Sequence, residues 1–200
     1  LQDLFELAGM DDRLVPAERL IASLRGRKSP SEQATMRQAI DQALAIMGVG
    51  RRAIREGVSE RAVAAVILEE AARRGLDTAW SRDTCPAVFT GPDARDLHAR
   101  PSDRAFASGH VGYIDFGVRV DGYCSDLQRS FYVSGGSPTI PDAVRRGFTV
   151  LTDAIERARA VMRAGATGLE VDAAARGHIV SEGYEEFPHA LGHQVGRFAH

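Results

Sequence analysis

The hydrophobic pattern predicts two pairs of helices, one on each side of a long hairpin. The first pair opens at Ser29-Pro30-Ser31-Glu32, a capping box with proline at the first helical position. A break near Gly57 precedes a second helix over about 59–74, which ends in a cationic turn before Gly75. The apolar stripe of the first helix has helical spacing and comprises Met36, Ala39, Ile40, Ala43, Leu44 and Met47.

The second pair of helices repeats the first at a constant offset of 108 residues. A helix from about 142 ends at Gly165, and the capping box Thr167–Glu170 opens a helix that closes at Gly183. Both breaks and the apolar stripe keep their register, which indicates an internal duplication. Residues related by the offset include Met36 and Val144, Ile40 and Phe148, Met47 and Ile155, Gly57 and Gly165, Ser59 and Thr167, and Gly75 and Gly183.

Residues 113–133, between the two helix pairs, predict a β-hairpin that turns at Asp121-Gly122. Asp-Gly between alternating apolar residues is typical of a type I′ turn, which needs positive φ at both central positions. In this register Val120 pairs with Tyr123, and Asp126 lies opposite Gly117. One face of the hairpin then collects the apolar side chains of Ile114, Phe116, Val118, Leu127, Phe131 and Val133.

The other face of the hairpin carries two carboxylates, Asp115 and Asp126. The period of two places them on one face as diagonal neighbours, with backbones about 7–8 Å apart. Their charges repel, and a bound cation would offset that cost. The spacing alone leaves two interpretations open: a metal site, or a pair of solvent-facing hairpin residues.

Strands are expected after each helix pair, because the two blocks share their spacing. In the first half these are 86–90 and the hairpin, and in the second half a strand should begin near Phe187. The predicted fold class is therefore α+β, an antiparallel sheet covered by two pseudo-symmetric helix pairs. We expect residues 1–27 to be a lead-in or the tail of an N-terminal domain, and 28–200 to form part of this α+β domain.

The composition of the 200 residues is that of an ordinary globular protein, 44% hydrophobic and 26% charged. The net charge of −2 gives no reason to expect nucleic acid or an anionic membrane as a partner. No apolar run approaches the roughly 18 residues of a membrane span, and no signal peptide is recognisable. Cys85 and Cys124 match no metal or redox spacing, and no disulfide framework is implied. We therefore expect a cytoplasmic protein.

Three of the six histidines are crowded into the last twelve residues of the chain. His189, His193 and His200 alternate with Gly192 and Gly196, and glycine permits the close backbone approach that a ligand or metal cleft needs. Neutral imidazole is a common metal ligand and a proton shuttle near neutral pH. A histidine-rich loop without function is the alternative.

The other histidines give weaker signals. His98 lies in a loop rich in Pro, Asp and Arg, LHARPSDR, and alone it would be unremarkable. His110 precedes a strand in a turn-like setting, and His178 lies within the fourth helix, so we expect both to have packing or surface roles.

At these residues the sequence resembles the M24 metallopeptidases of the pita-bread fold, in their Xaa-Pro dipeptidase and Xaa-Pro aminopeptidase branch. The resemblance covers about residues 21–200, and its segments occur in the family's order. They are LRGRKSPSEQATMRQAI, LHARPSDR, IDFGVRVDGYCSDLQRSF and HALGHQVGRFAH.

The resemblance implies two-metal hydrolysis of an Xaa-Pro peptide bond. Asp115 would bind one metal, Asp126 would bridge two, and His193 would bind the second. His200 would contact the substrate, and His98 and His189 would assist in substrate positioning and proton handling. Mn²⁺ or Co²⁺ is the cation that the resemblance suggests, with Zn²⁺ and Fe²⁺ as alternatives. It also implies a proline-containing peptide as substrate and a homodimer.

The chain departs from the family pattern in one respect. The family uses two further glutamate ligands beyond the histidine segment, and Glu185 and Glu186 do not match them. The sequence begins with Leu1 and ends at His200, so we expect a fragment whose C-terminal part is missing. We further expect incomplete metal binding and little activity from it.

Other interpretations use the same fold. A creatinase-like enzyme works without metal, and its branch lacks the paired aspartates that this sequence has at 115 and 126. A metal-dependent lyase built on the same fold is a related interpretation. A non-catalytic binding module, such as some histone chaperone domains, has no need of the aspartates and histidines.

Overall fold

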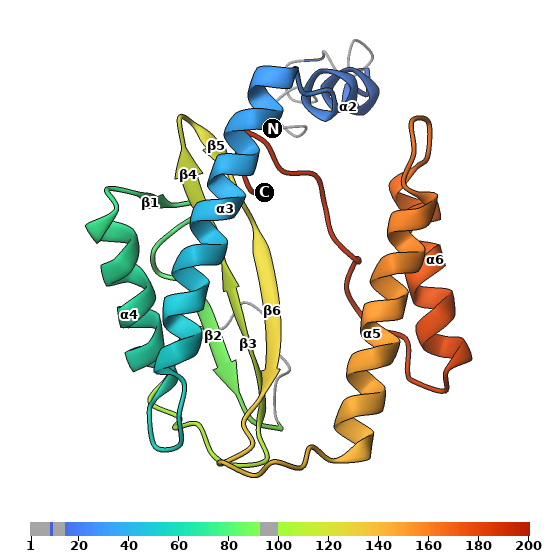
Figure 1. Cartoon of the computed structure of the whole chain (residues 1–200). Coiled ribbons are helices and arrows are strands. Elements are labelled where there is room, and N and C mark those ends of the chain that lie inside the picture. The colour runs from blue at the N-terminus through green and yellow to red at the C-terminus, as the bar shows by residue number, and fades with distance from the viewer. Residues whose placement is uncertain (1–8, 10–14, 93–99) are drawn as a thin grey trace. The chain divides into compact units, whose positions relative to one another are not determined.

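The computed structural model of the chain (Figure 1) describes residues 9, 15–92 and 100–200. The chain divides into two compact units, Leu1–Ala34 and Thr35–His200. The first contains helix α2, Glu18–Gly26, which ends before an extended Arg27. No helix within the described ranges is long and apolar enough to cross a membrane.

The pairs of helices form where the pattern predicts them. They are α3 (Pro30–Ala53) with α4 (Glu60–Arg73), and α5 (Asp142–Val161) with α6 (Gly168–Ser181). The α4 and α6 bounds differ by the predicted 108 residues, and Ser59 and Thr167 cap both with their side chains. The Ser29 capping box also forms, because the Ser29 N–H donates to Glu32 and the Glu32 N–H to Ser29.

The described strands are all antiparallel and form two three-stranded sheets. One has the order β2-β3-β6, and the other has the order β1-β4-β5. Their bounds are β1 Asp77–Thr78, β2 Ala87–Thr90, β3 Val111–Phe116, β4 Val118–Val120, β5 Tyr123–Cys124 and β6 Leu127–Tyr132.

The hairpin has the predicted turn and the predicted register. Asp121 and Gly122 have φ of 46° and 81°, as a type I′ turn requires. Val120 pairs with Tyr123 in one sheet, and Asp115 pairs with Gln128 in the other, in the same register. Each of the two predicted arms is divided into two strands, however, because the ladder is interrupted between these pairs.

The interruption lies at Gly117 and Ser125, where the two arms of the hairpin come unusually close. A Cβ on Gly117 would lie 1.9 Å from the Ser125 carbonyl oxygen. The buried Ser125 hydroxyl accepts the Val118 N–H at 3.0 Å, and the Ser125 N–H donates to the Val118 carbonyl at 2.9 Å. The close approach bends one long ladder into two sheets and leaves Asp126 at the bend.

The main core lies between α3, α4 and the hairpin. Ile46 and Ile67 from the helices and Phe116 from the sheet are fully buried in it. Each such side chain contributes about 1.5–3 kcal/mol when removed from water. The predicted apolar face of the hairpin is confirmed, because Ile114, Phe116, Val118 and Val133 belong to this core and Leu127 and Phe131 pack against it.

Helices α5 and α6 share a separate core made of Val150, Ala154, Ala158, Ala175 and Ile179. Phe187 and Leu191 pack against it from the segment that follows α6. The strand expected from near Phe187 is not formed, since 185–200 is irregular chain. A strand is stable only where a neighbour accepts its backbone hydrogen bonds, and no strand of the described chain pairs with this segment.

Both cysteine thiols are buried, and they are expected to stay unreactive in the folded protein. Burial raises the pKa of Cys85 to about 12, and burial also raises the pKa of Cys124. The thiolate is the reactive form, and an exposed cysteine forms it near pH 8.5. Labelling with iodoacetamide should therefore show no rise between pH 7 and about 9.5 in the native protein, against a clear rise in denaturant. Native labelling of either thiol in this range would contradict its burial.

Candidate metal centre

Asp126 lies at the bend of the hairpin, immediately after the buried Ser125 and before β6. Its side chain is 14% exposed, so its carboxylate is largely withdrawn from water. The hydrogen bonds between Ser125 and Val118 fix the backbone directly before it. The carboxylate therefore has a well-defined position, as a metal ligand requires.

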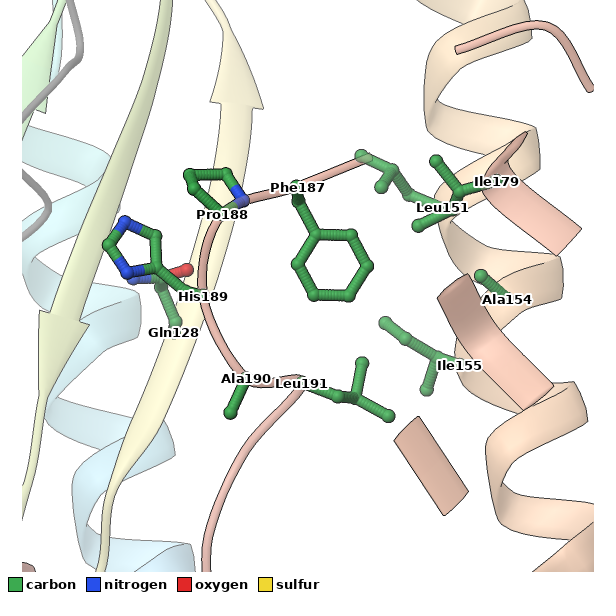
Figure 2. A pocket seen from close by; sticks show the side chains of 10 residues that line it. All are labelled: Gln128, Leu151, Ala154, Ile155, Ile179, Phe187, Pro188, His189, Ala190 and Leu191. Atoms are coloured by element: carbon green, nitrogen blue, oxygen red, sulfur yellow. The ribbon is translucent and has the colours of Figure 1, made fainter. Parts of the chain in front are cut away.

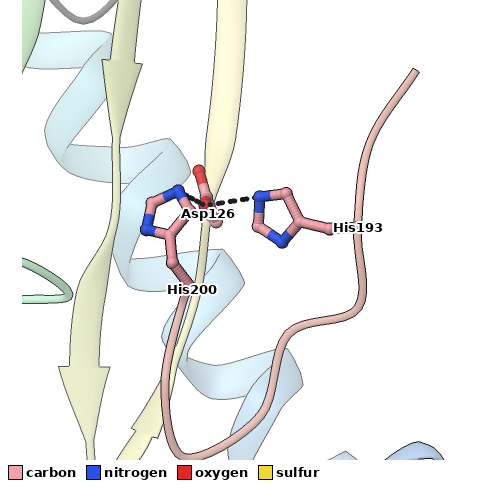
Figure 3. A group of neighbouring side chains, drawn as sticks. All are labelled: Asp126, His193 and His200. Carbon is pink, nitrogen blue, oxygen red and sulfur yellow. Dashed lines mark ion pairs between the residues drawn. The ribbon is translucent and has the colours of Figure 1, made fainter. Parts of the chain in front are cut away.

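His193 and His200 approach Asp126 from the C-terminal segment (Figure 3). The Nε2 atoms of His193 and His200 lie 3.4 and 3.8 Å from Asp126 Oδ2. The centroids of the two imidazole rings are 4.9 Å apart. Each of the three residues offers one ligand atom, and these three atoms lie within 4.8 Å of one another. Asp126, His193 and His200 are called the Asp–His–His cluster below.

The C-terminal segment is fastened to the hairpin next to this cluster. The Cys124 N–H donates to the Gly196 carbonyl at 2.7 Å, and Ala199 is buried against Cys124 and Ala79. Arg197 lies over the Tyr123 ring at 4.9 Å. These contacts hold the chain between His193 and His200 against β5.

Of the other predicted site residues, Asp115 is in the middle strand of the sheet β2-β3-β6. It is half-buried, with its Oδ1 atom buried, and the register places it diagonal to Asp126 as predicted. It lies outside the cluster that the described residues form. His98 falls at 93–99, outside the described residues.

His189 is exposed and lies apart from the Asp–His–His cluster. Figure 2 shows it on the side of Gln128, whereas Phe187 and Leu191 point toward α5 and Ile179. These residues line an open pocket of about 640 Å³. The structure thus brings together the histidines at 193 and 200 and leaves the one at 189 beside a largely apolar pocket.

The remaining histidines have the packing surroundings that the sequence predicts. His110 Nδ1 lies 3.1 Å from the Thr90 hydroxyl and accepts the Ala107 N–H at 3.3 Å. His178 is half-buried within α6.

One residue of the site was not predicted from the sequence. Trp80 meets the His200 ring edge-on, with ring centroids 5.6 Å apart, and its Nε1–H donates to the Thr84 carbonyl. It is the single tryptophan of the chain, but no periodicity or motif connects residue 80 with residue 200.

The chemistry of the cluster suits a divalent transition metal. One carboxylate and two imidazoles offer oxygen and nitrogen donors, the ligand types that Mn, Co, Fe and Zn accept. Their convergence from two distant parts of the chain fits a bound cation, which would also offset the cost of withdrawing Asp126 from water.

Comparison with known proteins finds peptidases that are similar over most of the chain. The profile of Metallopeptidase family M24 matches residues 34–200. An Xaa-Pro dipeptidase of Lactobacillus delbrueckii subsp. lactis is 34% identical over 181 residues, which are 90% of this chain and 48% of that protein. A putative dipeptidase of Bacillus subtilis is 31% identical over 189 residues, 94% of this chain and 50% of its own length.

Solved structures show the same similarity. The prolidase from Pyrococcus furiosus has a TM-score of 0.79 at 31% identity, over 92% of this chain and 52% of that one. The X-Pro aminopeptidase from Thermotoga maritima has a TM-score of 0.79 at 30% identity, over 95% of this chain and 50% of that one. The fold is the pita-bread fold of these enzymes, and the chain spans about half the length of the curated relatives it matches. The chain belongs to metallopeptidase family M24.

Proposed function

We propose that the protein containing these residues is a metal-dependent peptidase that hydrolyses the Xaa-Pro peptide bond. The observation that carries the proposal is the convergence of Asp126, His193 and His200 within 4.8 Å. The relatives named as Xaa-Pro dipeptidase and prolidase support the choice of substrate.

In this proposal Asp115, Asp126 and His193 hold a dinuclear centre, with Mn²⁺ or Co²⁺ as the cations. Asp126 would bridge the pair, because its carboxylate meets both histidines and the strand register makes it a diagonal neighbour of Asp115. Bound divalent ions at such a site polarise the peptide carbonyl and lower the pKa of water. Further ligands would come from parts of the protein outside residues 1–200.

The remaining histidines would handle substrate and protons. His200 Nε2, 3.8 Å from the Asp126 carboxylate, would donate a proton at the reacting bond. Trp80 packs against its ring and limits its orientation. His98 and His189 would position the substrate. We also propose a cytoplasmic homodimer.

The test uses the full-length protein, stripped with a chelator and reloaded with Mn²⁺ or Co²⁺. Hydrolysis of an Xaa-Pro dipeptide should be lost on stripping and restored on reloading, whereas the matched Xaa-Ala dipeptide should be a poor substrate. Metal content should be measured alongside activity. Full activity after complete stripping would overturn the metal-dependent mechanism, and equal rates on both dipeptides would overturn the proline specificity.

A further inference from the structure

A half-buried cation, Arg176 on α6, holds the chain that leads to His193. Its Nη1 donates to the Phe187 carbonyl at 2.6 Å, and its Nη2 donates to the His189 carbonyl at 2.8 Å. Its guanidinium also lies over the Phe187 ring, 4.1 Å from the centroid. One side chain thus makes two hydrogen bonds to carbonyls and one cation–π contact within three consecutive residues.

Asp172, one helical turn earlier on α6, binds both Arg176 and the same segment of chain. Its carboxylate accepts two hydrogen bonds from Arg176, at 2.7 and 3.0 Å, and a third from the Leu191 N–H at 2.8 Å. The hydrogen bonds from Arg176 and from the Leu191 N–H hold the pKa of Asp172 below its usual value. The pair therefore stays ionised at neutral pH, and it fixes the chain at Phe187, His189 and Leu191.

This ion pair differs from the exposed pairs elsewhere on the helices. The side chains of Arg176 and Asp172 are only 23% and 19% exposed, against 75% and 63% for Arg159 and Glu156. Exposed pairs contribute little, since water competes for both partners. Arg176 and Asp172 instead direct their hydrogen bonds to backbone groups of irregular chain, which has no ladder of its own to satisfy them.

The segment that Asp172 and Arg176 hold, residues 187–191, ends two residues before His193. On the far side of His193 the chain is fastened again, where the Cys124 N–H donates to the Gly196 carbonyl. His193 therefore lies on a short span between two anchors, one on α6 and one on β5. The two anchors together limit how far the span can move from Asp126.

We propose that Asp172 and Arg176 are positioning residues of the metal centre, which hold residues 187–191 so that His193 meets Asp126. The inference rests on the proposed function for the role of His193 as a ligand. Groups that orient metal ligands in this way typically change metal affinity by about 10–100-fold when they are removed.

The experiment compares Arg176→Lys with wild type in the full-length protein. Lysine keeps the charge but cannot reproduce the guanidinium fork, so it cannot hold two carbonyls and the carboxylate together. Affinity for Co²⁺, followed by the visible absorption of the bound ion, should fall about 10–100-fold. Backbone amide exchange at 189–193 should accelerate, while the rate of peptide hydrolysis at saturating metal should recover most of its wild-type value.

Arg146→Lys is the matched control. Arg146 on α5 makes the same kinds of contact with the chain after α6, donating to the Glu182 carbonyl at 2.9 Å and lying over Tyr184. These contacts precede residues 187–191, so the variant should keep wild-type Co²⁺ affinity and wild-type amide exchange at 189–193. Asp172→Asn is the second test variant, since it keeps the size of the side chain and removes its charge.

The outcomes separate this inference from the proposed function. Equal Co²⁺ affinity and equal exchange in Arg176→Lys and wild type would overturn the positioning role and leave the peptidase proposal standing. A wild-type protein that binds no Co²⁺ would refute the metal centre and, with it, this inference. Loss of the fold in both Arg176→Lys and Asp172→Asn would assign the pair to overall stability and also overturn the inference.

Discussion

Replacing Asp126 with Asn is expected to abolish hydrolysis by the full-length protein and to weaken metal binding by more than about 100-fold. This loss of affinity is larger than the loss expected when a group that only orients a ligand is removed. Asn keeps the shape of Asp126 but removes the charge that faces His193 and His200 at 3.4 and 3.8 Å. A neutral amide oxygen is a much poorer partner for a divalent cation than a carboxylate. Isothermal titration with Mn²⁺, together with turnover of an Xaa-Pro dipeptide, measures both effects.

Asp121→Asn is the control for this substitution. It removes the same charge from the same hairpin, at an exposed turn position whose φ of 46° asparagine tolerates well. Metal affinity and turnover should stay at their wild-type values. If Asp126→Asn instead behaved like Asp121→Asn, Asp126 could not be a bridging ligand and the assignment of the site would fail.

Replacing Gly117 with Ala is expected to lower the free energy of unfolding by about 1–3 kcal/mol, the usual cost of overpacking. The new Cβ would meet the Ser125 carbonyl oxygen at 1.9 Å and Trp80 at 2.9 Å. The first neighbour is backbone, so the arms of the hairpin must separate. Because Ser125 directly precedes Asp126, metal affinity should fall as well. Urea unfolding gives the first quantity and Mn²⁺ titration the second.

Gly177→Ala gives the opposite expectation with the same added methyl group. Gly177 lies within α6, and the added Cβ would meet no atom of the described residues outside its own helical turn within 4 Å. Alanine should therefore stabilise the helix by about 0.5–1 kcal/mol. A Gly117→Ala protein as stable as wild type would show that the hairpin does not need the close approach at Ser125.

Local signals in the sequence predicted most of the elements. The Asp121-Gly122 turn defined the register of the hairpin, because a type I′ turn admits few residues and a slip would move every side chain to the other face. The capping residues Ser59 and Thr167 gave the starts of α4 and α6 for a similar reason, since each satisfies an N–H that the helix leaves open.

Features that depend on contacts between distant residues were not predictable. The bend at Gly117 comes from an approach to Ser125 that the alternation of apolar residues does not encode. The strand expected near Phe187 depended on a neighbour, and Arg176 holds that chain by side-chain hydrogen bonds instead. An Asp and an Arg four residues apart predict only a helix-surface pair.

The candidate site was predictable in its residue types more than in its geometry. Asp126 and His193 were singled out from the sequence, and the structure brings them together. His200 was expected to contact substrate, yet its distance from Asp126 is close to that of His193. Imidazole spacing along an irregular segment cannot separate a ligand from a proton carrier, because no periodic backbone fixes where each ring points.

The two anchors of the C-terminal segment also bear on the entropy of the unfolded chain. The hydrogen bond between Cys124 and Gly196 closes a large ring of chain that includes α5 and α6. The contact between Asp172 and Leu191 closes a much smaller ring inside it. Closing a loop costs entropy that grows with the logarithm of its length. Once the inner ring has formed, the chain left free in the outer ring is shorter, so closing the outer ring costs less entropy. His193 therefore reaches Asp126 in two smaller steps of ordering, and a bound cation would need to restrain only a short span.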